Sequence, residues 1–435
     1  MTARNERGFT LIELMVALVV FLFAISAATT TFLPLVNQYK QQSKVSESQI
    51  EEVIGIELLR IDVENAGYGL PWTIYDVGGD SNYNNDWGSI NYPETDDAQL
   101  YNAYDDGPNS SPRGIVLGND AGVGTVAANN GLGINNSDYL VIKATNVRTD
   151  DEMQKWTYIH NEREAGLQNP HEWMKPDGTT SWSERNMDST TKVIAIKPSY
   201  SDDIFNILMT STGAPPEYYA SMSQYPPNTV TTELIPFDPS ETLILYAVGT
   251  GGATGDPGLR MPFNRAEYYI SSSNVPSRCA PNSGVLVKSV ISHTNGQRVA
   301  GLPLLDCVAD LQVVFGLDMD DDGILGTYSD YVTRTDAPSD PEGAAIANVQ
   351  ATMDDAELLR NRLKEVRLYI LAHEGQIDPR FDYGQDTVEV GDSALMGPLG
   401  HTTFNIANTA TQRLRSYRWK VYTMVINPEN LKPTD

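Results

Sequence analysis

The chain has 435 residues and a mass of 47.8 kDa, and its 30 Lys and Arg against 57 Asp and Glu give a formal net charge of -27. A chain this acidic repels nucleic-acid phosphates, so the composition argues against a DNA or RNA partner. Apolar residues make up 40% of the chain, enough for a hydrophobic core, and 22 Tyr with 34 Gly are typical of a loop-rich β protein. With only 2 Cys, a Cys-rich zinc module and a multi-cluster iron–sulfur protein are excluded.

One apolar segment near the N-terminus is long enough to cross a membrane. Residues 1–8 are polar and carry Arg4 and Arg7, and residues 9–36 contain a single ionisable side chain, Glu13. A hydrocarbon core of about 30 Å needs about 20 apolar residues. Basic residues before the span predict a cytoplasmic N-terminus and place the remainder outside the inner membrane. A cleaved secretory signal fits less well, because the apolar pattern continues past the small residues that would form its cleavage site.

Glu13 is the informative residue of this segment. On insertion scales a charged side chain at the centre of a spanning helix costs about 2.5–3.5 kcal/mol, and less near the edge. A plain signal anchor has no reason to hold such a residue. Glu13 is therefore either solvated at the depth of the lipid headgroups or provided with a counter-ion during function.

Residues 7–14, RGFTLIEL, resemble the processing site of type IV prepilins, in which a short basic leader and a Gly precede Phe-Thr-Leu-Ile-Glu and an apolar helix. The resemblance implies that a membrane-embedded prepilin peptidase removes residues 1–8 by cutting after Gly8, and that the new amine of Phe9 is methylated. It also implies that Glu13 is the assembly residue, because its carboxylate can neutralise the terminal amine of a neighbouring subunit as the apolar helices bundle.

The helix is expected to continue beyond the membrane and to span residues 9–65 as one spine. Between residues 40 and 65 there is no Pro, and apolar residues three and four apart predict one apolar face, to be covered by the C-terminal region. These apolar positions are Ile50, Val53, Ile54, Leu58 and Ile61. Pro34 is expected to kink or locally melt the helix. The Gly-rich residues 66–71 end it.

Short β-branched or aromatic runs bounded by turn residues predict strands in the rest of the chain. They lie at residues 139–144, 193–197, 242–248, 267–270, 285–291, 311–317, 366–372 and 419–426. A second helix is expected at residues 353–363, and residues 71–136 are expected to form a long loop with short strands. A helix followed by strands predicts an α+β fold, with antiparallel sheet packed on the long helix. Residues 66–435 would then form an extracytoplasmic β-rich head with loop insertions.

Three further patches resemble PilW-type minor pilins: residues 62–69, residues 305–313 with 315–318, and residues 417–422 with 427–428. The resemblance implies a pilin-like fold and a minor pilin that primes a type IV pilus and stays at its tip. Its partners would be other minor pilins and the major pilin, through the N-terminal helix. It would lie in the inner membrane as a single-pass protein with a periplasmic head, and then in the pilus at the cell surface. Residues 71–136 and 147–188 match no pattern used here.

Two other functions stay open at this point. One is a GspJ-type pseudopilin of a type II secretion system, and the other is a tip adhesin whose long loops bind a surface, a sugar or a partner protein. The signals for catalysis are weak, because the five His are scattered and no H-E-x-x-H, P-loop or dinucleotide fingerprint is present. We therefore expect a protein that is not an enzyme and requires no cofactor.

The two cysteines, Cys279 and Cys307, are separated by a strand-rich segment that can fold back as a hairpin. In an extracytoplasmic head they are expected to be oxidised. On the chain-entropy description, closing a loop of this size stabilises the folded protein by roughly 3–4 kcal/mol. Two buried free thiols are the alternative.

Residues 318–324, DMDDDGI, contain the pattern D-x-D-x-D-G, which is the first half of a calcium loop. The expected ligands are Asp318, Asp320 and Asp322, followed by the backbone carbonyl of Ile324. The second half departs from the EF-hand pattern, because the twelfth position is Ser329 where that pattern has Glu. A structural calcium ion and a solvated acidic turn therefore both remain open.

Overall fold

The computed structural model describes residues 10–75, 83–84, 87, 90, 92–94, 106, 110–119, 137–178, 180–198, 206–211, 216–225, 234–236, 238–251, 258–397, 399 and 402–431. The expected leader, residues 1–8, and the expected cleavage site between Gly8 and Phe9 lie outside the described residues.

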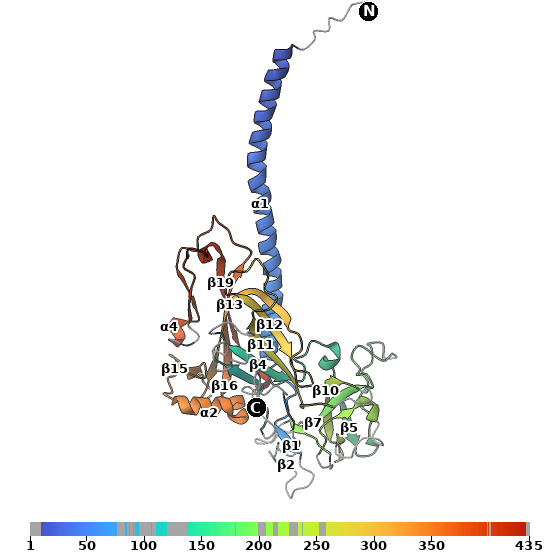
Figure 1. Cartoon of the computed structure of the whole chain (residues 1–435). Helices are drawn as coiled ribbons and strands as arrows, with labels where there is room; N and C mark the ends of the chain where they lie inside the picture. Colours follow the sequence, from blue (N-terminus) through green and yellow to red (C-terminus); the bar gives the residue numbers. More distant parts are fainter. Residues whose placement is uncertain are drawn as a thin grey trace, which may run out of the picture.

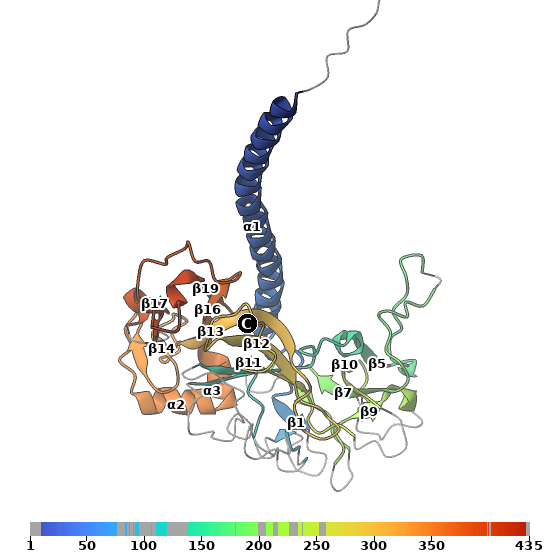
Figure 2. The same ribbon diagram turned by 45° about the horizontal axis from the view of Figure 1, so that its top comes forward.

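The chain begins with one helix, α1 (Leu11–Glu64), which projects from a β-rich head (Figure 1). Its 54 residues span about 80 Å at 1.5 Å per residue. Thr10 is the N-cap and Asn65 the C-cap, so α1 begins and ends within two residues of the bounds expected for the spine. The helix runs unbroken through Pro34, so the expected local melting is wrong. The helix tolerates the loss of one backbone donor, and α1 only curves gently (Figure 2).

The head covers a face of α1 that overlaps the predicted apolar face only in part: of the predicted positions whose side chains the structure describes, Leu58 packs against the main core. Val53 and Ile54 are 69% and 66% exposed, whereas Gly55, Leu59 and Val63 are buried. Close approach decides the orientation: a Cβ on Gly55 would lie 1.8 Å from the backbone oxygen of a residue in strand β13 (Leu302–Leu317), Leu304. The glycine turns towards the sheet because only a residue without a side chain fits there.

The larger sheet has nine strands, and all its pairings are antiparallel. Its strands besides β13 are β3 (Ile115–Gly118), β4 (Tyr139–Ala144), β11 (Asn264–Ser271), β12 (Gly284–Val290), β14 (Thr327–Ser329), β15 (Arg334–Asp336), β16 (Leu363–Glu374) and β19 (Arg418–Ile426). The order is β15-β14-β13-β12-β11-β4-β3, and β16 pairs with both β13 and β19. The C-terminal part of α1 packs on β13, β16 and β19 over the main hydrophobic core.

A second sheet of eight strands forms its own lobe of the head, with separate hydrophobic cores (Figures 1 and 2). Its strands are β1 (Thr73–Tyr75), β2 (Tyr83–Asn84), β5 (Trp156–Glu162), β6 (Gly166–Leu167), β7 (Thr191–Lys197), β8 (Ile207–Leu208), β9 (Ala220–Ser221) and β10 (Thr242–Thr250). The order is β2-β1-β8-β7-β10-β5-β6, with β9 paired to β7, and only the β1–β8 pair is parallel among the strands that the structure describes. Residues 147–188, which match no known pattern, thus contribute two strands to this lobe.

The remaining elements are short. They are the hairpin β17 (Thr387–Val390) and β18 (Thr402–Asn405), the helices α2 (Ile346–Asp354), α3 (Ala356–Arg362) and α4 (Ser393–Met396), and 3-10 turns at Asp151–Gln154, Met222–Gln224, Leu414–Ser416 and Glu429–Leu431. The expected helix at 353–363 is therefore two helices. Asp355 breaks it, because this residue is extended and its side chain accepts bonds from the first backbone N–H groups of α3.

All eight expected strands are present, and 311–317 is the end of the 16-residue β13. The α+β fold, a long N-terminal helix followed by mostly antiparallel sheet, is confirmed.

Candidate functional site

The first turn of α1 holds the expected assembly residue. Glu13 Oε2 accepts hydrogen bonds from the backbone N of Thr10 at 3.0 Å and from Thr10 Oγ1 at 2.9 Å. The backbone N of Glu13 donates to Thr10 Oγ1 at 3.4 Å, which completes a capping box. The carboxylate is exposed and lies at the positive end of the helix dipole. A neighbouring cation can therefore reach it.

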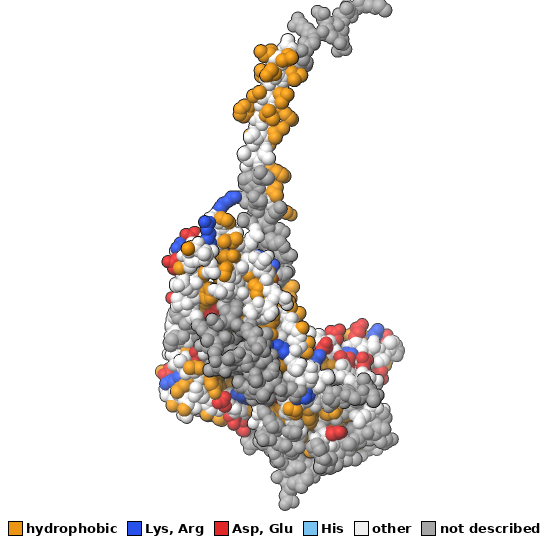
Figure 3. Space-filling view, viewed as in Figure 1, with side chains coloured by type: hydrophobic (Ala, Val, Ile, Leu, Met, Phe, Trp, Pro, Cys, Tyr) orange, Lys and Arg blue, Asp and Glu red, His pale blue; other side chains and the backbone are white. Residues whose placement is uncertain are grey.

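The first part of α1 is apolar apart from Glu13 and is not covered by the head. Its segment Leu11–Thr30 has a mean hydropathy of 2.6 and none of it is buried, so its length and composition suit a membrane span. Figure 3 shows hydrophobic side chains around this part of the helix. Exposed apolar surface on this scale marks a segment that a membrane or other helices must cover.

The expected disulfide is formed. Cys279 and Cys307 are bonded, with a Cα–Cα distance of 4.9 Å and a sequence separation of 28 residues. The bridge ties the segment before β12 to β13, so it closes the hairpin that these two strands form. The alternative of two free thiols is wrong.

The acidic loop follows directly after β13. Asp318 is 1% exposed, and its Oδ2 accepts a bond from the backbone N of Gly323 at 2.9 Å and lies 3.0 Å from Lys364 Nζ. Burial raises the pKa of Asp318, but the bonds from Lys364 and Gly323 outweigh it and hold the pKa below its usual value. Asp321, by contrast, reaches outwards to the guanidinium of Arg362 at 3.1 Å.

Two carboxylates that the sequence pattern does not predict join this loop. Oxygens of Asp318, Asp320 and Glu342 lie within 4.8 Å of one another, and so do those of Asp320, Asp322 and Asp340. Asp340 and Glu342 lie in the segment between β15 and α2, at no spacing that a motif records, so no sequence signal identifies them.

The added carboxylates are in an unfavourable electrostatic setting. Desolvation and then the neighbouring carboxylates raise the pKa values of Asp340 and Glu342. Asp340 Oδ2 is buried and has no hydrogen-bond partner among the described residues. A set of carboxylate oxygens with one unpaired buried member fits a hard divalent cation such as Ca²⁺. Ile324, the expected carbonyl ligand, donates its backbone N–H to Asp322 Oδ1 at 2.8 Å, and its ligand role stays a prediction.

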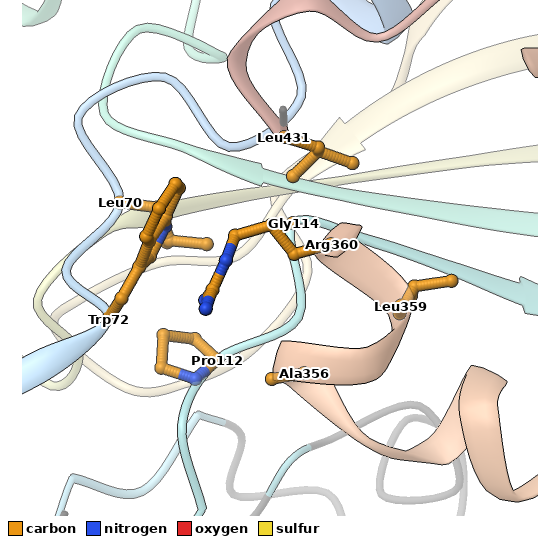
Figure 4. A pocket seen from close by; sticks show the side chains of 8 residues that line it. All are labelled: Leu70, Trp72, Pro112, Gly114, Ala356, Leu359, Arg360 and Leu431. Atoms are coloured by element: carbon orange, nitrogen blue, oxygen red, sulfur yellow. The ribbon is translucent and has the colours of Figure 1, made fainter. Parts of the chain in front are cut away.

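A small cavity lies where the two lobes meet (Figure 4). It is lined by Leu70, Trp72, Pro112, Gly114, Ala356, Leu359, Arg360 and Leu431. The guanidinium of Arg360 lies 3.9 Å from the ring centroid of Trp72, and desolvation lowers the pKa of Arg360 to about 10. A volume of about 10 Å³ holds one water molecule at most, so the lining residues form a closely packed contact between the two lobes.

Comparison with known protein families identifies only the N-terminus. A family model for the prokaryotic N-terminal methylation motif matches residues 3–29. Comparisons with the curated proteins and with the solved structures find no match. The motif implies processing by prepilin peptidase, its combination with one apolar helix fits anchoring in the inner membrane, and it points to a structural protein more than to an enzyme. Motif and helix together support a type IV pilin-like protein.

Proposed function

We propose that this chain is a minor pilin that takes part in priming and assembling a type IV pilus and lies at its tip. Prepilin peptidase would cut after Gly8, and the amine of Phe9 would be methylated. The observation that carries the proposal is the division of α1: its motif-bearing segment Leu11–Thr30 is apolar and exposed, while its C-terminal residues from Gly55 pack on the head.

The mechanism is physical. Before assembly, the bilayer covers the apolar segment Leu11–Thr30; afterwards, the helices of neighbouring subunits cover it. An ionised Glu13 without a counter-ion has an unfavourable free energy in either environment. The amine of a neighbouring subunit's Phe9 supplies the counter-ion. The capping box holds the carboxylate at the start of the helix, where that amine would arrive. The pairing would set the axial register between subunits.

The size of the head favours a terminal position. The described residues of the head include two large sheets, and the lobe built on the second extends away from the axis of α1 (Figures 1 and 2). A filament repeats one head-to-tail contact many times, and a bulky second lobe obstructs such repeats. A subunit at the tip meets neighbours on one side only. A pseudopilin of a secretion system would use the same helix, and dependence of protein secretion on this chain, with piliation unaffected, would favour it.

Replacement of Glu13 by Gln tests the assembly role. At an effective dielectric constant of about 20, an ion pair at 4 Å gains about 4 kcal/mol, and desolvation of the two charges offsets part of this gain, so incorporation into filaments should fall by roughly tenfold or more. Glu57→Gln is the matched control, since Glu57 is exposed and lies 3.3 Å from Arg60 on the same helix. Sheared filaments would be quantified by immunoblotting. Equal incorporation of the Glu13→Gln chain and the wild-type chain would refute the role of Glu13.

We also propose that the acidic loop binds a structural calcium ion. Asp318, Asp320 and Asp322 would hold it together with Asp340 and Glu342. The ion would neutralise carboxylates that otherwise repel one another and would fix the segment after β15 to the end of β13. Its role would be stability of the head.

Calcium titration of the full chain in detergent micelles tests this site. At 100 times the dissociation constant, bound Ca²⁺ would stabilise the head by about 2.7 kcal/mol. Asp320→Asn should weaken binding, whereas Asp321→Asn should not, because Asp321 faces Arg362. The absence of both a calorimetric signal and a shift in melting temperature between Ca²⁺ and chelator would end the proposal.

A further inference from the structure

The lobe built on the second sheet carries a group of aromatic side chains on its outer surface. Three of the six Trp of the chain fall in residues 147–188. Along β5, Trp156 and Tyr158 alternate with the buried Thr157 and Ile159, so the two rings face away from the core. They belong to the part of the chain that no sequence pattern explains.

A hairpin places two further aromatic rings, those of His171 and Trp173, beside β5. The backbone N of His171 donates to the oxygen of Tyr158 at 2.8 Å, and the backbone N of Trp182 donates to the oxygen of Trp173 at 2.8 Å. Thr157 Oγ1 donates to the oxygen of His171 at 2.6 Å. We call the four side chains Trp156, Tyr158, His171 and Trp173 the aromatic patch.

The rings of the aromatic patch hold one another in place. His171 stacks on Tyr158 at 4.7 Å and stands edge-on to Trp173 at 4.9 Å. Trp156 is edge-on to Trp173 at 5.2 Å, and Trp173 Nε1 donates to the backbone oxygen of Trp156 at 3.1 Å. The patch is therefore a preformed surface, and a ligand would bind it with little loss of side-chain entropy.

Such a surface is costly to leave in water. Trp156 is 39% exposed and His171 is exposed, although large aromatic side chains are usually covered. Clustered, half-exposed Trp and Tyr are typical of the centres of protein interfaces, where they contribute much of the binding energy. The lobe also lies away from the membrane-spanning half of α1, so neither bilayer nor bundled helices would cover it (Figures 1 and 2).

The charge around the patch selects the partner. Residues 147–188 contain 9 Asp and Glu against 5 Lys and Arg. Figure 3 shows acidic side chains gathered on the lobe that carries β5. This field repels anionic polymers and anionic lipids and attracts cations. Aromatic faces attract cations as well, and Arg more often than Lys because its planar guanidinium stacks on a ring.

The same hairpin already contains a contact between an Arg guanidinium and a Trp ring. The guanidinium of Arg185 lies 4.4 Å from the ring centroid of Trp182, and Trp182 Nε1 donates to Glu184 Oε2 at 3.1 Å. A guanidinium, a tryptophan face and a carboxylate are thus already combined next to the aromatic patch. We propose that the aromatic patch binds an arginine-bearing segment of a partner protein. This proposal is independent of the proposed pilin function.

Fluorescence anisotropy with the full chain in neutral detergent micelles tests the proposal. The probe is a fluorescein-labelled Gly-Ser peptide carrying four Arg, compared with twins that carry four Lys or four Glu. The Arg peptide should bind more tightly than the Lys twin, the Glu twin should not bind, and added salt should weaken binding. Trp156→Ala should weaken Arg-peptide binding by about 2- to 30-fold, and Trp156→Phe by less, because it keeps a ring.

Phe381→Ala is the matched control. The guanidinium of Arg418 lies 4.5 Å from the ring centroid of Phe381, and this pair lies outside the β5 lobe. The Phe381→Ala chain should bind the Arg peptide like the wild-type chain. Melting curves would show that each variant is folded, and Glu172→Gln offers a second variant that removes charge without removing a ring. Equal affinities for the Arg and Lys peptides, with no effect of Trp156→Ala, would show that the peptides bind through charge alone and would overturn the proposal. Binding of a neutral oligosaccharide or of phosphatidylcholine vesicles, dependent on Trp156, with no binding of the Arg peptide, would overturn it as well.

Discussion

His373 shows how one buried residue ties the stability of the head to pH. It is buried beside the disulfide, and its Nε2 accepts a hydrogen bond from the backbone N of Ala280 at 2.8 Å. Tyr417 and Trp419 pack against its ring. Burial lowers the pKa of His373 to about 4, because a protonated ring would be desolvated and would lose its acceptor nitrogen.

This lowered pKa predicts destabilisation in mild acid. Between the unfolded pKa of about 6.5 and the folded value of about 4, the unfolded chain binds a proton that the folded chain does not. The contribution of His373 to the free energy of unfolding is therefore fully present above pH 6.5 and is lost as the pH falls towards 4. Its total is about 3 kcal/mol. Denaturant unfolding of the head at a series of pH values measures it. His373→Gln should flatten this part of the profile; an unchanged profile would contradict the assignment to His373.

Residue-level prediction from sequence succeeds where the pattern is local. The disulfide partners are the only two Cys, and Glu13 lies within a contiguous motif. Asp340 and Glu342 could not be predicted as neighbours of the Asp318 loop, because the strand pairings of β14 and β15 bring them there. The aromatic patch was missed for the same reason: its rings come from β5 and from a hairpin that packs beside it.

At the scale of elements, the packing of α1 depends on a single glycine. In an exposed helix Gly→Ala stabilises by about 1 kcal/mol, because alanine loses less backbone entropy. At Gly55 the added Cβ would collide with backbone atoms of Leu304. Backbone atoms in a strand cannot rotate away as the end of a flexible side chain can. Gly55→Ala should therefore reverse that sign and destabilise the head by about 1–3 kcal/mol through overpacking.

Thermal unfolding of the full chain in micelles measures the effect of Gly55→Ala. Val53→Ala serves as the matched control, since Val53 is largely exposed on the same turn of α1 and should change the melting temperature little. A Gly55→Ala chain that melts above the wild type would show that α1 does not approach β13 as closely as described.

The elements also show which sequence signals are reliable. Runs of β-branched residues located all eight expected strands, since each run lies in a sheet with at least one buried face and is bounded by turn residues. The apolar spacing on α1 predicted only part of the buried face, at Leu58. Spacing counts only apolar side chains, whereas the buried face includes Gly55 and also Asp62, whose carboxylate is 2.5 Å from Lys288 Nζ. A glycine contact and a buried ion pair leave no trace in hydrophobic periodicity.

As a whole, the molecule is a long N-terminal helix joined to a head with two lobes. The class of fold was predictable, because one helix precedes all strands. The division of the head was not, since the second sheet includes β2, β6, β8 and β9, each only two residues long. Such strands carry no periodicity and form only because their neighbours in the sheet are already placed.

The central claim is that proteolysis and methylation convert a membrane precursor into an assembly subunit. N-terminal mass spectrometry of the protein purified from membranes or filaments tests it most directly. We expect a chain that begins with N-methylated Phe9 and lacks residues 1–8. A chain that still carries residues 1–8, or one that begins at another position within α1, would contradict it.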